Sequence, residues 1–239
     1  MPVKMNPIEP AATDAILVGD PRRAFALAQE LTVRPRMSHQ ARGLWGYTGE
    51  TAGGTSLTVQ STGSGGPAAV PVIGDLADQG VTRMVRLGTC LANDPDIEAG
   101  TVLLVQRALI RDGAAAKLSS GAAECLPDPD LLSALATVGR PVTVSSHDLV
   151  GRFEPTDGQG ETAGVARDLQ TATLLAMARR LELQAAAVLV VAEDQSGTRL
   201  DEETLTGIFR PVGRKVAERL APPGNDPPDS RESKPEVEG

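Results

Sequence analysis

The sequence predicts an α/β protein of one domain, with a twisted, mostly parallel central sheet between two layers of helices. Short apolar runs typical of strands alternate along the chain with segments of helical spacing. Residues 185–192 are almost wholly apolar, as in a strand that is covered on both faces. The chain has 239 residues, which fits one large domain of this three-layer α/β/α kind.

The first half of the chain carries the clearest element signals. Residues 15–18 form a short apolar strand that ends at a Gly-Asp-Pro turn, and residues 22–31 then place their apolar side chains on one helical face. Two strands, 43–49 and 56–61, flank a Gly-Gly turn. A helix is expected over 67–80, because it begins with proline and ends with glycine.

The second half continues the alternation of strands and helices. Further strands are expected at 83–87, 101–107, 142–146 and 185–192, and further helices at 128–137, 167–183 and 201–220. Ligands of such sheets bind at the carboxyl ends of strands. The candidate motifs GDPRR, RLGTC and AED all follow strands, so we expect them to meet at one edge.

The domain is expected to span residues 14–220. An irregular lead-in, 1–13, precedes it. The tail 221–239 is rich in proline and charge and has no aromatic residue, so we expect it to be flexible.

Composition limits the classes of partner. The formal charge of −8 disfavours nucleic acid and anionic membranes, but a local cluster of arginine and backbone N–H groups can still bind phosphate. Cys90 and Cys125 form neither a disulfide framework nor a metal cluster, so no metal or cofactor is expected. The chain has no transmembrane run, and its N-terminus lacks the apolar core of a signal peptide. These features favour a cytoplasmic protein.

Two motifs suggest an anion site. Gly19 and Arg23 belong to the GDPRR segment, where a strand ends and a helix begins. The N-terminus of that helix and the guanidinium of Arg23 could together hold an anion. Arg86 and Thr89 belong to RLGT at the end of an interior strand, where a buried arginine needs a partner. The alternatives are a turn with solvated arginines for the first motif and an internal carboxylate partner for the second.

Together these stretches resemble a known family. ILVGDPRRA, ARGLWGYTGE, VQSTGSGGPAA, VRLGTC, DLQTATLLAMARRL and VLVVAED, in this order over residues 15–194, are similar to the hexameric purine nucleoside and uridine phosphorylases. The resemblance implies an enzyme, a pentosyltransferase, that uses inorganic phosphate to cleave a ribonucleoside into base and ribose 1-phosphate.

The resemblance also implies roles for particular residues. It assigns phosphate binding to Gly19, Arg23, Arg86 and Thr89, and it assigns a further arginine of the site, Arg42, to the neighbouring subunit. The implied partners are therefore nucleoside, phosphate and further copies of the chain, in a homo-oligomer that is a dimer at least and commonly a hexamer.

The sugar and base motifs depart from the family pattern. Gln170 stands where a glutamate grips the ribose hydroxyls, and Leu169 stands where a methionine is usual. Asp194 retains the aspartate that protonates a departing purine, although a capping or loop carboxylate is equally consistent with its sequence. Phe153 or Phe209 could replace a missing aromatic that stacks on the base. We expect Gln170→Glu to raise activity if Gln170 faces the ribose.

Two functions fit these departures. The first is a nucleoside phosphorylase, with purine or pyrimidine specificity left open although Asp194 points to purines. The alternative is a weakly catalytic or non-catalytic homologue that binds phosphate or nucleoside, or serves as a partner subunit.

Overall fold

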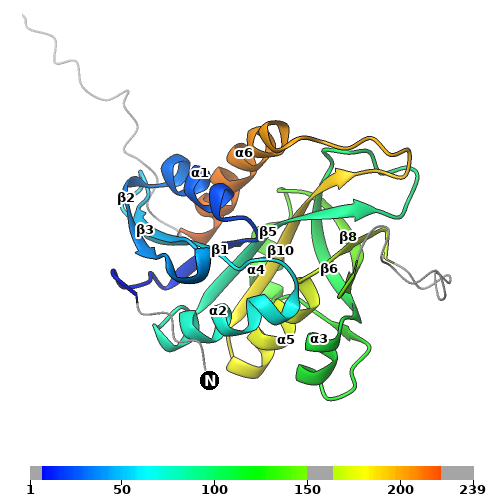
Figure 1. Ribbon diagram of the computed structural model, residues 1–239, viewed down its shortest axis with the longest axis horizontal. Coiled ribbons are helices and arrows are strands. Elements are labelled where there is room, and N and C mark those ends of the chain that lie inside the picture. Colours follow the sequence, from blue (N-terminus) through cyan, green and yellow to red (C-terminus); the bar gives the residue numbers. More distant parts are fainter. Residues whose placement is uncertain (1–6, 150–163, 222–239) are drawn as a thin grey trace, which may run out of the picture.

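The computed structural model describes residues 7–149 and 164–221 (Figure 1). Its helices are α1 Pro21–Leu31, η1 Ala41–Gly43, α2 Gly66–Asp78, α3 Gly113–Leu118, α4 Pro129–Ala134, α5 Thr171–Leu181 and α6 Glu202–Leu220. Its strands are β1 Asp14–Val18, β2 Val33–His39, β3 Gly46–Glu50, β4 Ser56–Ser61, β5 Arg83–Ala92, β6 Val102–Arg111, β7 Glu124–Cys125, β8 Arg140–His147, β9 Ala166–Asp168 and β10 Gln184–Glu193.

The sheet is mixed, and part of it closes into a barrel. The strands β10, β6, β8, β9 and β5 pair in that order, and β5 pairs with β10 again, which closes the ring. The strands β1, β4, β3 and β2 extend the sheet from β5. Among the described residues, five strand pairings are parallel and five are antiparallel.

The expectation of a mostly parallel sheet was therefore wrong, although the α/β class is confirmed. The three described strands that were not predicted, β2, β7 and β9, pair antiparallel with β3, β6 and β5 respectively. The strands β7 and β9 are only two and three residues long, which is too short to show a period. The sequence of β2, VRPRMSH, is largely polar and lies at an edge of the sheet, so it lacks the apolar run of a buried strand.

Helices cover both faces of the sheet. One buried cluster joins the sheet to α1, α4 and α6, and another joins it to α2, α3 and α5. Along β1 the side chains alternate between the two, because Ile16 and Val18 belong to the first cluster and Ala15 and Leu17 to the second. Figure 1 shows α1 and α6 on one side of the central strands and α2 and α5 on the other.

Three parallel strands point their carboxyl ends at one edge. β5 pairs parallel with β1 on one side and with β10 on the other. The GDPRR, RLGTC and AED segments follow or end these strands. The topology therefore brings the three motifs together, as the sequence predicts.

The helix expected at 167–183 begins later than predicted. Residues 166–168 form β9, and α5 begins only at Thr171. Strand β5 is longer than expected, because it continues past Leu87 to Ala92. Phe153 and most of the tail 221–239 lie outside the described residues. Within the described ranges, no helix is long and apolar enough to cross a membrane.

His39 gives the fold a pH dependence that can be measured. It lies buried at the end of β2, and burial lowers its pKa, although the charge of Asp75 and a hydrogen bond with the Ala41 backbone oppose this shift. The unfolded chain therefore binds this proton first as the pH falls. We predict that the free energy of unfolding declines as the pH drops below about 6.5 and levels off below the folded pKa.

Urea denaturation between pH 7.5 and 5 measures this slope. His39→Gln should remove the His39 contribution, whereas His147→Gln, at the second of the two histidines of the chain, should retain it. Equal slopes in the parent and His39→Gln would contradict the prediction.

Candidate active site

A cavity of about 490 Å³ lies at the shared edge of β1, β5 and β10. Its walls come from the segment after β1, the glycine-rich loop before α2, the end of β5, the segment 167–170 and the start of α6. Six of the eight residues that the sequence singled out line this cavity: Gly19, Arg23, Arg86, Thr89, Leu169 and Gln170. The fold therefore gathers residues that lie far apart in the chain around one space.

Arg86 is buried and held by two acceptors from the same segment. Its Nε and Nη2 donate to Oδ2 of Asp168 at 3.3 and 3.1 Å, and its Nη1 donates to Oε1 of Gln170 at 2.7 Å. The guanidinium lies against Gly88, where an added Cβ would stand 2.6 Å from its Cζ. The glycine of the RLGT motif thus leaves room for the arginine side chain.

Asp168 was not singled out from the sequence, yet it organises this part of the site. Its side chain is fully buried, and besides Arg86 it accepts hydrogen bonds from Oγ of Ser146 at 2.6 Å and Oγ1 of Thr171 at 2.7 Å. It also accepts from the backbone N–H of Thr171 at the start of α5. Asp168 lies two residues before the N-cap Gln170, and its Oδ2 accepts from the backbone N–H of Gln170, as in an Asx turn. The helix predicted from residue 167 placed Asp168 inside the helix, where this turn is not expected.

Gln170 is saturated by hydrogen bonds. Its Nε2 donates to the carbonyl oxygens of Gly63 and Gly65 at 2.7 and 2.9 Å. Its Oε1 accepts from Oγ1 of Thr62 at 2.9 Å as well as from Arg86. The amide therefore ties the glycine-rich loop to the arginine of β5, a role that needs both a donor and an acceptor.

Arg23 is buried on α1 and has a different kind of partner. Its guanidinium lies over the ring of Phe209, with Cζ 4.4 Å from the ring centroid. Its Nη2 lies 3.0 Å from Oε2 of Glu202, the first residue of α6. Phe209 is fully buried beneath this arginine, so it supports the cation and does not face a bound base.

Two of the helix N-termini at the cavity, those of α1 and α2, differ in their capping. At α1, Oδ1 of Asp20 accepts from the backbone N–H groups of Arg22 and Arg23 at 2.7 and 3.2 Å. At α2, the N-cap residue Gly65 makes no side-chain capping bond and lines the cavity. The N-terminus of α2 therefore lies next to the cavity without a capping carboxylate, whereas that of α1 is capped by Asp20.

Asp194 and Arg42 do not line the cavity of this chain. The Asp194 carboxylate organises the turn after β10. It accepts from the backbone N–H of Ala99 and from both the backbone N–H and the hydroxyl of Ser196. These bonds, led by that from the Ser196 hydroxyl, lower the pKa of Asp194, which opposes a role as proton donor at neutral pH. Arg42 is exposed in η1 with a φ of 59°.

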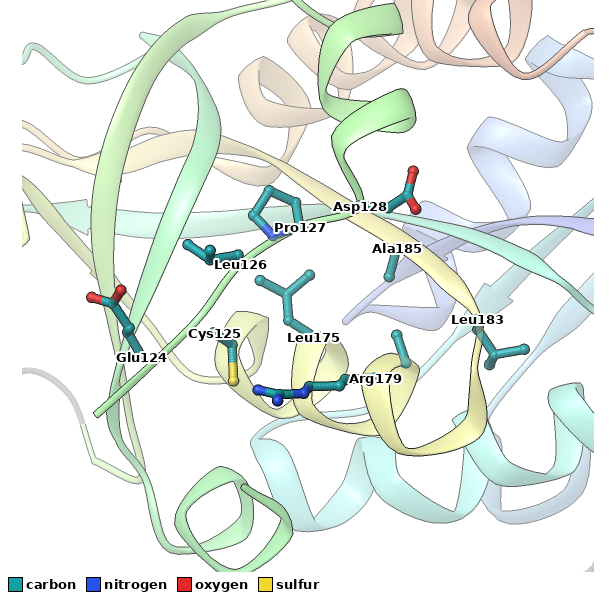
Figure 2. Close-up of a pocket in the computed structure, with 10 residues that line it drawn as sticks. Glu124, Cys125, Leu126, Pro127, Asp128, Leu175, Arg179, Leu183 and Ala185 are labelled. Carbon is teal, nitrogen blue, oxygen red and sulfur yellow. The ribbon is translucent and has the colours of Figure 1, made fainter. Parts of the chain in front are cut away.

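A second cavity, of about 470 Å³, lies at the opposite end of β10 (Figure 2). The segment from Glu124 to Asp128 forms one wall, and α5 forms the other through Leu175 and Arg179. Figure 2 shows the Arg179 side chain reaching along the groove toward Cys125. This cavity adjoins the amino end of β10 and contains none of the residues that the sequence singled out. The first cavity is therefore the candidate active site.

Comparison with known proteins assigns the chain to a family. The profile of the Phosphorylase superfamily matches residues 13–154, more than half of the chain, and the chain belongs to this superfamily. A purine nucleoside phosphorylase structure from Toxoplasma gondii, solved in complex with immucillin-H, has the same fold. It superposes with a TM-score of 0.79 over 87% of this chain and 90% of that one, at 18% identity.

Curated relatives carry three related names. A guanosine phosphorylase from Halorubrum lacusprofundi is 29% identical over 79% of this chain and 83% of its own length. A DeoD-type purine nucleoside phosphorylase from Bacillus subtilis is 28% identical over 76% of this chain and 82% of its own length. A uridine phosphorylase from Treponema pallidum is 33% identical over 54% of this chain and 49% of its own length. Superfamily membership and these names indicate nucleoside phosphorylase activity.

The sequence suggests that Gln170→Glu raises activity, but the hydrogen bonds of Gln170 lead to the opposite prediction. A carboxylate there would place an acceptor against the Gly63 and Gly65 carbonyl oxygens, and each buried group left unpaired costs about 1–3 kcal/mol. We predict that Gln170→Glu lowers the free energy of unfolding by about 2 kcal/mol and lowers kcat/KM for phosphorolysis.

Urea denaturation and steady-state kinetics measure the two effects. The matched control is Gln79→Glu, in which the same change falls at a half-buried position outside the cavity. A rise of tenfold or more in kcat/KM for Gln170→Glu would show instead that residue 170 acts on the ribose.

Proposed function

We propose that the chain cleaves the N-glycosidic bond of a ribonucleoside with inorganic phosphate, giving free base and ribose 1-phosphate. The observation that carries this proposal is the pair of buried arginines, Arg23 on α1 and Arg86 on β5, which line one cavity. Buried cations that face an open cavity favour an anionic ligand. Phosphate is the anion that a phosphorylase requires.

The cavity supplies further donors for phosphate. The Thr89 hydroxyl belongs to the end of β5, and the uncapped N-terminus of α2 lies at Gly65. A phosphate oxygen can accept from a hydroxyl, from a helix N-terminus and from a guanidinium at once. Gly19, without a side chain, adds backbone to the wall beside Arg23.

The expected chemistry needs stabilisation of positive charge on the sugar. As the glycosidic bond breaks, the anomeric carbon develops oxocarbenium character, and a phosphate held beside it provides both the negative charge and the nucleophilic oxygen. The new C–O bond forms to phosphate, and the electron pair of the broken C–N bond leaves with the base. We propose that the segment at Leu169 and Gln170 forms the sugar side of the cavity, with Leu169 against the ribose.

A weakly catalytic or non-catalytic binder is the second candidate. Two observations favour it: the Gln170 amide is fully used in bonds within the protein, and the Asp194 carboxylate is used in its own turn. Catalysis of purine cleavage through Asp194 would require that carboxylate to leave the turn and enter the cavity.

A nucleoside screen separates the two candidates. Inosine, guanosine, adenosine and uridine are incubated with the protein and phosphate, and the release of ribose 1-phosphate is followed. The phosphorylase proposal expects turnover of at least one nucleoside that depends on phosphate. Binding of phosphate without turnover of any nucleoside would favour the binder.

Thr89→Val tests the phosphate position without disturbing the buried ion pairs. The two side chains have nearly the same shape, but valine cannot donate to phosphate. Losing a hydrogen bond to a charged group costs about 1.5–3 kcal/mol, so we predict about tenfold to hundredfold weaker phosphate binding in calorimetry. Thr143→Val, on β8 and outside the cavity, should bind phosphate as the parent does. Parental affinity in Thr89→Val would remove Thr89 from the phosphate site.

We propose that Arg42 acts in the site of a neighbouring copy within a homo-oligomer. It is exposed on this chain and does not line this chain's cavity, which fits a residue that is presented outward. Asparagine tolerates the left-handed backbone of this position, so Arg42→Asn removes the charge at little cost in conformation.

Mixed oligomers test the shared site. Arg42→Asn and Arg23→Gln should each be impaired alone. In a mixed dimer, however, one site combines the intact Arg23 of one chain with the intact Arg42 of the other. We predict that co-refolding the two variants restores activity well above the sum of the separate proteins. A mixture no more active than that sum, or a monomer in sedimentation at micromolar concentration, would exclude the proposal.

A further inference from the structure

We propose that Glu202 competes with phosphate for Arg23, and that this competition sets the affinity of the protein for phosphate. The inference rests on the proposed function, since it concerns the phosphate site of that reaction. In this arrangement Glu202 holds the arginine while the site is empty, and phosphate binds by taking over the same guanidinium.

The contact between the two side chains is a single-point ion pair. One nitrogen of Arg23, Nη2, meets one oxygen of Glu202, Oε2, at 3.0 Å. The Nε of Arg23 is buried and has no hydrogen-bond partner among the described residues. A guanidinium pairs best with an acceptor that engages two of its nitrogens. Glu202 therefore leaves Arg23 incompletely satisfied, and its departure would free Nη2 for a tetrahedral oxyanion.

The two partners differ sharply in exposure. The Arg23 side chain is 7% exposed, whereas that of Glu202 is 73% exposed. Arg23 is also fixed by its position over Phe209. When phosphate approaches, the arginine stays in place and the glutamate can turn into water, where its charge is readily solvated. Exposed carboxylates hold such pairs only weakly.

Asp168, the partner of Arg86 in the same cavity, is a permanent partner, in contrast to Glu202. Its side chain is fully buried, and it accepts from Ser146 and from the start of α5 as well as from Arg86. Leaving Arg86 would strand a buried carboxylate, which is costly. Of the two carboxylates paired with Arg23 and Arg86, only Glu202 can be exchanged.

The charges of the cavity support this reading. Arg23, Arg86 and Arg167 line the cavity with three positive charges, and Asp20, Asp168 and Glu202 line it with three negative charges, so these six side chains sum to zero. A phosphate dianion would enter without a net attraction while Glu202 remains. When Glu202 turns away, the local sum becomes positive and favours the anion.

The backbone of Glu202 need not move for this exchange. Asp201 caps α6 by accepting from the backbone N–H of Thr204 at 2.8 Å. The helix is anchored by buried residues farther along, among them Leu205 and Phe209. Only the side-chain torsions of Glu202 have to change.

Glu202→Gln tests the competition, with Glu203→Gln as the matched control. Both residues are exposed in the first turn of α6, but only Glu202 lines the cavity. Titration calorimetry with inorganic phosphate should show at least about threefold tighter binding for Glu202→Gln than for the parent. Glu203→Gln should stay within about 1.5-fold of the parent. With the nucleoside that the parent turns over, KM for phosphate should fall in Glu202→Gln while kcat changes by less than twofold.

The outcomes separate this inference from the proposed function. If the parent binds phosphate and Glu202→Gln binds it equally or more weakly, the competition is overturned but the proposed phosphate site is not. An equal gain in phosphate affinity in Glu202→Gln and Glu203→Gln would also overturn the competition. The cause would then be the loss of one negative charge near the start of α6, whichever glutamate carried it. Failure of every form to bind phosphate would overturn the proposed function together with the inference. Binding by Glu202→Gln alone would support both.

Discussion

The buried bonds of Arg86 with Asp168 and Gln170 hold the candidate site together. Through them β5 is linked to the segment that opens α5, and through Gln170 the same arginine is linked to the glycine-rich loop before α2. An unpaired buried guanidinium would be costly, and so would an unpaired buried carboxylate. The side chains of Arg86, Asp168 and Gln170 therefore depend on one another for hydrogen-bond partners, and this dependence links the walls of the cavity.

Arg23 and Arg86 have distinct physical roles in the cavity because their partners differ. Arg86 is bonded to groups that are themselves buried, so it acts as a fixed charge and a structural link. Arg23 is supported by an aromatic face on one side and by an exposed carboxylate on the other. Such a pair can be exchanged for a ligand at little cost, whereas the pair at Arg86 cannot. This division explains how a site whose cations are already paired can still accept an anion.

The sequence predicted much of the candidate site but not how its members interact. GDPRR and RLGT led to Gly19, Arg23, Arg86 and Thr89, and the fold brings these residues to one cavity. The sequence did not single out Asp168, because the helix was expected to begin before it and the turn that Asp168 forms ahead of α5 was not predicted. The sequence did not single out Glu202 as a site residue, because an exposed acidic residue in the first turn of a helix is common and indicates no ligand. Asp194, a candidate from the motif alone, lies instead in a turn that satisfies its carboxylate.

The sequence by itself determined the α/β class, the family and the strand ends at which the motifs lie. The class and the strand ends follow from local patterns: apolar runs, helical spacing and glycine or proline at turns. The family follows from the resemblance of the ordered motifs to a known family. Only the tertiary structure decided that the sheet is mixed and partly closed, because short or polar strands such as β9 and β2 are defined by their partners in the sheet and carry no period of their own. It also decided that the Gln170 amide bonds to Arg86 and to the glycine-rich loop, and that Glu202 faces Arg23 from 179 residues away in the chain. Hydrogen bonds and charge pairs between distant segments depend on where the fold places them, and no local pattern encodes that placement.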